Sequence, residues 1–177
     1  MFSSFLDLLL LILIANGSPV LASKLFRGKF NQPLDFGISL RDGYRLLGSS
    51  KTWRGVLFSL AFTACCALIM GYPPETGLLI ALFSLCGDAI SSFIKRRMGR
   101  PSTSMFLFLD QIPESLLPAC IMGVEFQLAL IDIMYLVVIF ILAELALSRL
   151  MFALGVRQKP YSAFLCNLHL CLSSATI

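Results

Sequence analysis

The sequence has few charged residues for its length. Asp, Glu, Lys and Arg make up 14% of its 177 residues, whereas soluble domains carry about 25%, and apolar residues make up 58%. A soluble domain of this size could not bury so much apolar surface, so lipid must be the solvent for much of it. This composition excludes an ordinary soluble enzyme. The length suits one domain over residues 1–177, with no second domain.

The cysteines and the one histidine provide no recognisable metal or disulfide framework. None of the six cysteines belongs to a C-x-x-C pair, and His169 by itself cannot complete a zinc-ligand pattern. Four of the six lie inside apolar runs, where cysteine behaves as a small apolar residue. No basic segment precedes the apolar run that begins at Phe5, which favours a retained first helix over a cleaved signal peptide.

Apolar runs long enough for membrane helices follow one another along the chain. They are the segments 5–22, 56–70, 77–94, 105–124 and 128–147. The second is short, and the fourth is interrupted by Asp110, Pro113, Glu114 and Pro118. The sequence therefore predicts an all-α integral membrane bundle of about five transmembrane helices.

The basic residues follow only the odd-numbered runs. They are Lys24, Arg27, Lys29, Arg41, Arg45, Lys51 and Arg54 after the first, Lys95, Arg96, Arg97 and Arg100 after the third, and Arg149, Arg157 and Lys159 around the end of the fifth. The other two connections contain Glu75 and Glu125 and no basic residue. Because Lys and Arg concentrate in cytoplasmic loops, we expect a multi-pass protein of the cell (inner or plasma) membrane with its N-terminus outside. The C-terminus and a long loop over 23–55 then lie in the cytoplasm.

Four of the predicted helices place a polar side chain at a similar depth. Asp88 lies seven residues before Lys95, or about 10 Å inside the cytoplasmic boundary, and Asp110 lies at a similar depth in the fourth run. Asn16 and Glu144 hold comparable positions in the first and fifth runs. Charged groups inside a membrane are costly, and they usually serve a site or form structural pairs. Pairing of either aspartate with Lys95 or Arg54 is an equally good interpretation for each residue taken alone.

The residue types around these carboxylates favour phosphate chemistry. Ser84, Asp88, Ser91, Ser92 and Lys95 share one helix face, and Asp110 and Glu114 share another with Gln111 beside them. Carboxylate oxygens suit Mg²⁺, and Arg and Lys suit phosphate groups. The residues together predict metal-dependent phosphate chemistry on a lipid at the cytoplasmic edge. For the basic run at 95–97, contact with anionic headgroups is a serious alternative.

Several short motifs lie along the chain. Residues 42–55 read DGYRLLGSSKTWRG, Gly87-Asp88 is followed by SFIKRRMG at 92–99, and residues 109–111 read LDQ. These motifs resemble those of the CDP-archaeol synthases, a family related to the phosphatidate cytidylyltransferases. Asn16 with Pro19 and the segment 154–161 extend the resemblance over nearly the whole chain, and the segment after Tyr161 lies outside it. Arg54 stands where the phosphatidate enzymes carry an acidic residue, which favours the archaeol branch.

The resemblance implies transfer of a cytidylyl group from CTP to a lipid phosphate, of the 2,3-di-O-geranylgeranylglyceryl phosphate type, with release of pyrophosphate. It implies Mg²⁺ bound by Asp88 and Asp110, with Lys95 as a further catalytic residue. Residues expected to contact CTP or the lipid phosphate are Asn16, Asp42, Lys51, Thr52, Arg54, Ser92, Arg96 and Arg97. The expected partners are CTP, the lipid phosphate and the membrane, with no nucleic acid, and assembly with a second copy stays open.

Two other functions are compatible with the sequence. The first is a cytidylyltransferase for diacyl phosphatidic acid, since the motifs mark the reaction better than the lipid tails. The second is a small transporter or scaffold without enzymatic activity, in which the carboxylates and cations are structural pairs. Transporters often contain internal repeats with matching broken helices, and the two halves of this sequence show no convincing repeat. An enzyme would require CTP and Mg²⁺, whereas a scaffold would not.

Overall fold

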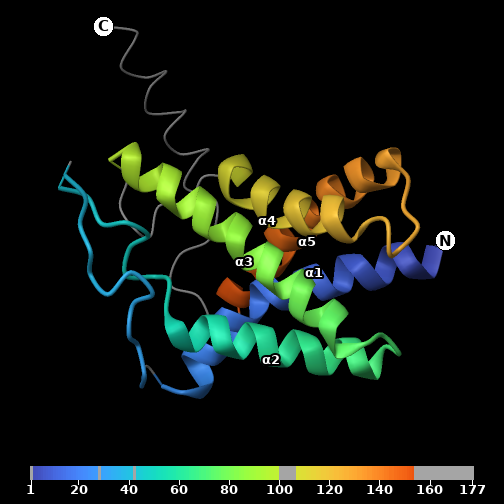
Figure 1. Cartoon of the computed structure of the whole chain (residues 1–177), viewed down its shortest axis with the longest axis horizontal. Coiled ribbons are helices and arrows are strands. Elements are labelled where there is room, and N and C mark those ends of the chain that lie inside the picture. Colours follow the sequence, from blue (N-terminus) through green and yellow to red (C-terminus); the bar gives the residue numbers. More distant parts are fainter. Residues whose placement is uncertain (1, 28, 42, 100–106, 154–177) are drawn as a thin grey trace, which may run out of the picture. The chain divides into compact units, whose positions relative to one another are not determined.

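A computed structural model of the chain describes residues 2–27, 29–41, 43–99 and 107–153. The described part contains five α-helices, as the sequence predicts (Figure 1). They are α1 (Phe2–Leu25), α2 (Trp53–Ile69), α3 (Pro74–Arg97), α4 (Leu107–Met122) and α5 (Leu130–Ala153). The all-α prediction is therefore confirmed.

Three of the described helices are long and apolar enough to cross a membrane. These segments are Ser4–Leu25, Pro74–Arg97 and Leu130–Leu150. The 17 residues of α2 rise only about 25 Å, less than the roughly 30 Å of a hydrocarbon core, and the described part of α4 has 16 residues. Helix α2 begins at Trp53, three residues before the predicted start, because Thr52 caps it: the Thr52 hydroxyl accepts a hydrogen bond from the Gly55 N–H at 3.3 Å.

The chain divides into two compact units, residues 1–140 and 141–177. In the first unit, α3 packs against α1, α2 and α4, and it lies between α2 and α4 in Figure 1. Its core contains Leu11, Ile80 and Phe140, all fully buried. The described part of the second unit is the end of α5, which carries Glu144. The predicted common depth of Glu144 and Asp88 therefore stays a prediction.

Two prolines inside helices leave backbone carbonyl groups without their helical hydrogen bonds. Serine hydroxyls of neighbouring helices donate to these carbonyls instead. Proline has no N–H, so in an α-helix the carbonyl four residues earlier loses its partner. Pro19 in α1 has this effect on the carbonyl of Ala15, which accepts a hydrogen bond from Ser59 of α2 at 2.6 Å. Such substitutes are needed in membrane helices because lipid offers no donor.

The same compensation joins α3 to α4. Pro118 in α4 leaves the carbonyl of Glu114 without its helical partner, and the Ser84 hydroxyl of α3 donates to that carbonyl at 3.1 Å. Near this bond the backbones of α3 and α4 almost touch. A Cβ atom added at Gly87 would lie 2.2 Å from the carbonyl oxygen of Pro113 and 2.8 Å from the backbone nitrogen of Glu114. Only glycine permits this approach, and the residue after it is Asp88.

Polar bonds also hold the end of the bundle where α2 turns into α3. The Tyr72 hydroxyl donates to the Asp7 carboxylate of α1 at 2.8 Å, and the Thr76 hydroxyl donates to the Glu125 carboxylate at 2.7 Å. Burial and the neighbouring Asp7 carboxylate raise the pKa of Tyr72, so its hydroxyl stays a donor at neutral pH. These contacts connect this turn to α1 and to the α4–α5 connection.

We expect Gly87→Ala to destabilise the protein by about 1–3 kcal/mol or more, because a new Cβ would overlap backbone atoms that cannot rotate away. Gly17→Ala is the matched control: Gly17 lies inside α1, and a Cβ there would meet no atom within 4 Å. That change should be neutral or stabilising, since alanine favours the helix over glycine. Thermal unfolding in detergent measures both changes, and equal melting temperatures for the two variants would contradict the close contact.

Candidate active site

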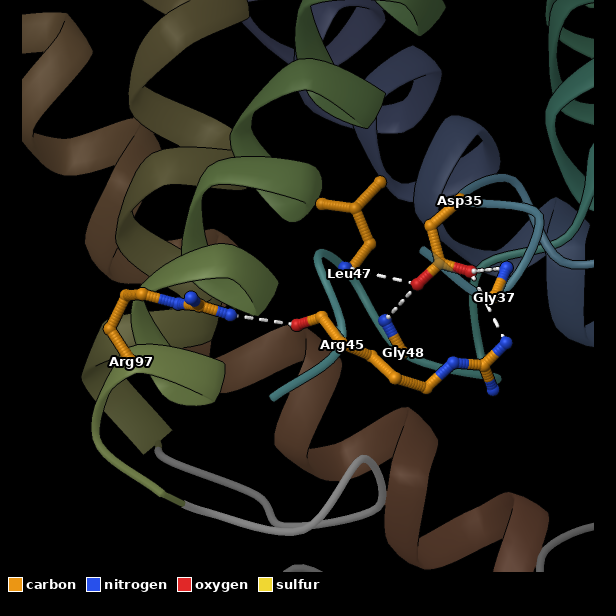
Figure 2. Close-up of polar contacts among 6 residues, drawn as sticks. All are labelled: Asp35, Gly37, Arg45, Leu47, Gly48 and Arg97. Atoms are coloured by element: carbon orange, nitrogen blue, oxygen red, sulfur yellow. Dashed lines mark hydrogen bonds and ion pairs between the residues drawn. The ribbon is translucent and has the colours of Figure 1, made fainter. Parts of the chain in front are cut away.

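The loop between α1 and α2 is organised around one buried carboxylate, that of Asp35. Its oxygens accept hydrogen bonds from the backbone N–H groups of Gly37 (3.0 Å), Leu47 (3.2 Å) and Gly48 (2.9 Å). The guanidinium of Arg45 lies 3.4 Å from the same carboxylate, whose side chain has no exposed surface (Figure 2). Asp35 therefore joins the two ends of the segment that leads to Lys51.

Asp35 stays ionised although it is buried. Burial alone would raise the pKa of its carboxyl, but the three backbone N–H donors and Arg45 outweigh that effect and lower the pKa below its ordinary value of 3.8. Sequence reasoning did not single out Asp35. The available signal was the Asp-x-Gly pattern, since aspartate commonly bonds the N–H two residues on, and Gly37 and Gly48 both have positive φ (84° and 99°).

Arg97 fixes this loop to the end of α3. Its guanidinium donates to the carbonyl of Arg45 at 2.9 Å and to that of Tyr44 at 3.3 Å (Figure 2 shows the first bond). Arg97 was predicted to contact CTP or the lipid phosphate. In the structure its described hydrogen bonds hold the loop backbone. The guanidinium carbon of Arg97 also lies over the aromatic ring of Phe93, 5.2 Å from the ring centroid.

Arg54 holds the first part of the same loop. Its guanidinium donates to the carbonyl of Lys29 at 2.5 Å and to the side-chain oxygen of Asn31 at 3.4 Å. Thr52, two residues before Arg54, is buried as the cap of α2. Arg54 and Thr52 therefore lie at the N-terminal end of α2, where the loop meets the helix.

An ionic centre lies where this loop meets α3 and α4. Lys51 of the loop forms an ion pair with Asp88 of α3, and Lys95 of α3 forms one with Asp110 of α4, with 2.7 Å between Nζ and Oδ1. Glu114 of α4 lies within hydrogen-bonding reach of Asp88. Asp88 and Asp110 thus come together as the sequence predicts. The alternative pairing holds for Asp110 with Lys95, whereas the partner of Asp88 is Lys51.

The charges of this centre act on one another across both ion pairs. Burial would lower the pKa of Lys51, but Asp88, together with Glu114 and Asp110, raises it above its ordinary value of 10.5. The ammonium is therefore a permanent cation at neutral pH. Charges that are partly removed from water interact strongly. A ligand that separates one of these ion pairs must therefore supply a compensating charge to each partner.

The remaining predicted residues are distributed around this centre. Ser92 and Arg96 are buried on the same face of α3, one turn apart. Asn16 is half-buried in α1, and its side-chain nitrogen has no hydrogen-bond partner in the described part of the chain. Gln111, next to Asp110, is fully buried. In the described part of the chain, neither the oxygen nor the nitrogen of its side-chain amide has a hydrogen-bond partner. Asp42 lies outside the described residues.

The oxygen donors fit a magnesium ion that binds together with a nucleotide. Over the described residues, no three His, Cys, Asp or Glu side chains are arranged to hold a metal ion by themselves. Mg²⁺ is usually held by one or two carboxylates, with substrate phosphates and water as its other ligands. Asp88 and Asp110 can supply two such carboxylates. The donor set suits metal–nucleotide binding and not a metal site made of protein ligands alone.

The sequence matches a family model over most of its length. The model, described as CarS-like, CDP-archaeol synthase, matches residues 3–73 and 73–161. The chain belongs to this family. The match ends at residue 161, where the resemblance found in the motifs also ends.

Relatives and a solved structure agree with the family model. The CDP-archaeol synthase of Thermofilum pendens is 29% identical over 154 residues, which cover 84% of this chain and 76% of that protein. The CDP-archaeol synthase of Pyrococcus furiosus is 40% identical over 107 residues, 55% of this chain and 60% of that protein. A solved structure of an intramembrane enzyme for archaeal membrane lipid biosynthesis is similar with a TM-score of 0.68 at 31% identity, covering 79% of this chain and 89% of that chain.

We expect Asp35→Asn to loosen the loop without unfolding the helices. The amide would present its NH₂ group to backbone donors, and bonds to a charged acceptor contribute about 1.5–3 kcal/mol. The N–H groups of Leu47 and Gly48 should exchange with solvent about 10- to 100-fold faster, as measured by hydrogen exchange. Asp132→Asn is the control, because Asp132 accepts a bond from Ala129 near the start of α5. Unchanged exchange in Asp35→Asn would contradict the role of this carboxylate.

The same measurement has a predicted pH dependence. The pKa of Asp35 is lower in the folded protein than its ordinary value of 3.8, so its stabilisation is complete above that value and is lost as the pH falls through the folded pKa. In the wild-type protein, the protection factors of the Leu47 and Gly48 N–H groups should therefore decrease as the pH is lowered from about 4. In Asp35→Asn they should stay low and nearly constant over that range.

Proposed function

We infer that this chain transfers the cytidylyl group of CTP to an archaeal lipid phosphate and releases pyrophosphate. Membership in the CDP-archaeol synthase family over residues 3–161 carries this conclusion. The cluster of Lys51, Asp88, Lys95 and Asp110 supports it, because this reaction joins two anionic substrates. Enzymatic function accounts for the cluster better than a structural role in a transporter or scaffold.

The reaction places negative charge where the ionic centre can offset it. An oxygen of the lipid phosphate attacks the α-phosphorus of CTP, and the bond from that phosphorus to the oxygen bridging to the β-phosphorus breaks. Charge builds on the phosphate oxygens and on the departing pyrophosphate. In the proposed mechanism Lys95 and Lys51 contact these oxygens and hold both substrates in line, so catalysis rests on positioning and electrostatics.

We propose Asp88 and Asp110 as the residues that hold Mg²⁺. When bound, the metal would neutralise phosphate charge and orient the reacting groups. In the substrate-free arrangement each carboxylate already faces a lysine. Phosphate binding would give Lys51 and Lys95 new anionic partners and leave the two carboxylates available as ligands. This exchange keeps every charge of the centre balanced.

The other predicted contacts remain part of the proposal. Thr52, Ser92 and Arg96 would bind phosphate oxygens, and their burial next to the ionic centre supports this role. Arg54 and Arg97 each donate to loop carbonyls, and their positive charge at this end of the loop supports a contact with an anionic substrate. The bare side-chain nitrogen of Asn16 supports a nucleotide contact, and the assignment of Asp42 rests on its motif alone. Residues 1–177 would act as one domain.

The direct test is incorporation of labelled CTP into lipid by purified protein with Mg²⁺. Archaeol-type phosphate and diacyl phosphatidic acid are offered side by side, and we expect CDP-lipid from the archaeol-type substrate. Asp88→Asn and Asp110→Asn should each lower the rate by about 100-fold or more, because groups acting on transition-state charge contribute factors of this size. Asp132→Asn, away from the centre, should leave the rate unchanged. Product from diacyl phosphatidic acid alone would assign the other lipid branch.

A different outcome would reject the enzyme. Folded protein that forms no CDP-lipid from either substrate, and binds neither CTP nor Mg²⁺, would leave a membrane scaffold as the explanation. Full activity in both Asp88→Asn and Asp110→Asn would retain the reaction but remove these residues from it.

We propose that the active site faces the cytoplasm. All of the basic residues follow the first, third and fifth apolar runs of the sequence, and CTP is a cytoplasmic substrate. In a cysteine-free protein, Ser39→Cys in the loop should react with an impermeant thiol reagent only from the cytoplasmic side of oriented vesicles. Glu75→Cys, at the start of α3, should react only from the other side. Both positions are exposed, so the reversed pattern would overturn this orientation.

A further inference from the structure

Apolar side chains gather where the α1–α2 loop meets the start of α2. This aromatic patch consists of Phe26, Phe30, Phe36, Trp53, Leu57 and Phe58. All but Phe36 line one groove of about 490 Å³, and the ring of Phe36 packs against that of Trp53 with 6.1 Å between the centroids. Phe30 is 77% exposed and Phe36 63%. A continuous exposed apolar surface of this kind marks contact with a partner or a membrane.

Two phenylalanines of the patch have a strained backbone. Phe30 and Phe36 have positive φ angles of 56° and 47°, a conformation that glycine or asparagine adopts more readily than a bulky residue. Neither side chain is buried in the described part of the chain, so packing within that part does not offset the strain. Strain that persists at a residue indicates a role for its side chain. For an exposed phenylalanine, that role is contact with something outside the chain.

The patch lies beside the first turns of α2, not beyond the end of the helix. Phe58 is five residues after Trp53, or about 7.5 Å further along α2, and its ring packs edge-on against that of Phe26, with 6.2 Å between the centroids. Helix α2 is shorter than a hydrocarbon core, so its first turn lies near the membrane boundary. Leu57, 61% exposed, makes the patch continuous with the lipid-facing surface of α2.

Hydrogen bonds within the chain satisfy backbone groups next to the patch. The Trp53 N–H donates to the carbonyl of Gln32 at 3.1 Å, and the Leu34 N–H donates to the carbonyl of Lys51 at 2.8 Å. Irregular backbone enters a membrane only at a cost, because lipid chains offer no hydrogen-bond partners. Pairing these groups internally lowers that cost. It also connects the patch directly to the backbone of Lys51.

The charges around the patch identify its partner. Lys24, Arg27 and Lys29 are exposed beside it, and residues 8–34 include no Asp or Glu. A second copy of the chain, placed patch to patch, would bring the same cations together. Anionic headgroups would instead compensate them, and aromatic side chains favour the membrane interface. We propose that the aromatic patch inserts into the headgroup region of the adjacent leaflet, where anionic lipids hold the α1–α2 loop against the membrane.

Tryptophan fluorescence tests this contact in the full-length protein. Trp53 is the one tryptophan of the sequence, so in a Trp53→Phe background Phe30→Trp or Phe36→Trp moves the fluorophore into the loop. In nanodiscs that contain phosphatidylglycerol, phospholipids brominated near the top of the acyl chain should quench both about threefold or more strongly than they quench Tyr44→Trp. Tyr44 is the matched control, because it is exposed on the same loop but lies beside Gly99, past the end of α3.

The same assay tests the charges. Changing Lys24, Arg27 and Lys29 to glutamine, or replacing phosphatidylglycerol by phosphatidylcholine, should reduce the quenching of Phe30→Trp by about half or more. Equal quenching with and without these charges would remove the anionic headgroup from the proposal.

A second experiment uses the backbone strain. Phe30→Gly relieves the strain at φ 56°, yet it removes the proposed anchor, so in nanodiscs the Trp53 N–H should exchange about fivefold faster. Gln127→Gly is the control, because Gln127 has nearly the same φ (53°) and an exposed polar side chain. There the Leu128 N–H, bonded to the carbonyl of Gly123, should exchange at the same rate or more slowly. Slower exchange in Phe30→Gly would contradict the anchor.

The quenching results also separate lipid from the other partners. Tryptophans at positions 30 and 36 that escape the brominated lipid and are quenched by aqueous acrylamide would place the patch in water and overturn the proposal. Tryptophans protected from both quenchers would show that protein covers the patch, through a second copy or another segment of the chain, and would overturn it as well. Both experiments measure lipid contact and not turnover, so failure of the proposed reaction would leave their outcome intact.

Discussion

The ion pair between Lys51 and Asp88 is the interaction on which the site depends. It joins a loop residue to a membrane helix across 37 positions of the sequence, and it keeps both charges compensated where the two side chains are largely buried. Either charge left there without a partner would be costly. The loop must therefore deliver Lys51 to this position, and α3 must present Asp88 to it. The contacts of Asp35 and Arg97 serve the first requirement, and the bond from Ser84 to Glu114 serves the second.

On the loop side, the requirement is met by Asp35 and Arg97. Asp35 gathers the N–H groups of Gly37, Leu47 and Gly48, and Arg97 ties the carbonyl of Arg45 to α3. A loop of this length would otherwise have many conformations available, and fixing them opposes folding. Bonds to two ionised side chains offset part of that entropy. Lys51 and Thr52, the residues proposed to bind phosphate, follow this segment and therefore start from a nearly fixed backbone.

On the helix side, small residues and prolines decide the geometry. Gly87 lets α4 approach α3 until Glu114 lies beside Asp88. Pro118 frees a carbonyl for Ser84, and this bond holds the same crossing. Helix association in a membrane has little hydrophobic driving force, so close contact and interhelical hydrogen bonds take its place. The carboxylate cluster is a direct product of that crossing.

The amino-acid sequence alone determined that the protein is an all-α membrane protein with five helices. It also determined the family and the convergence of Asp88 and Asp110. These features follow from apolar run lengths, local motifs and the constant rise of a helix, which sets the depth of each residue. The tertiary structure alone decided which lysine faces which aspartate, and it revealed Asp35 and the aromatic patch. Hydropathy and spacing give a residue's depth, but not how far its helix is rotated or how a loop returns to it. Those depend on backbone contacts between distant segments, such as Gly87 against Pro113.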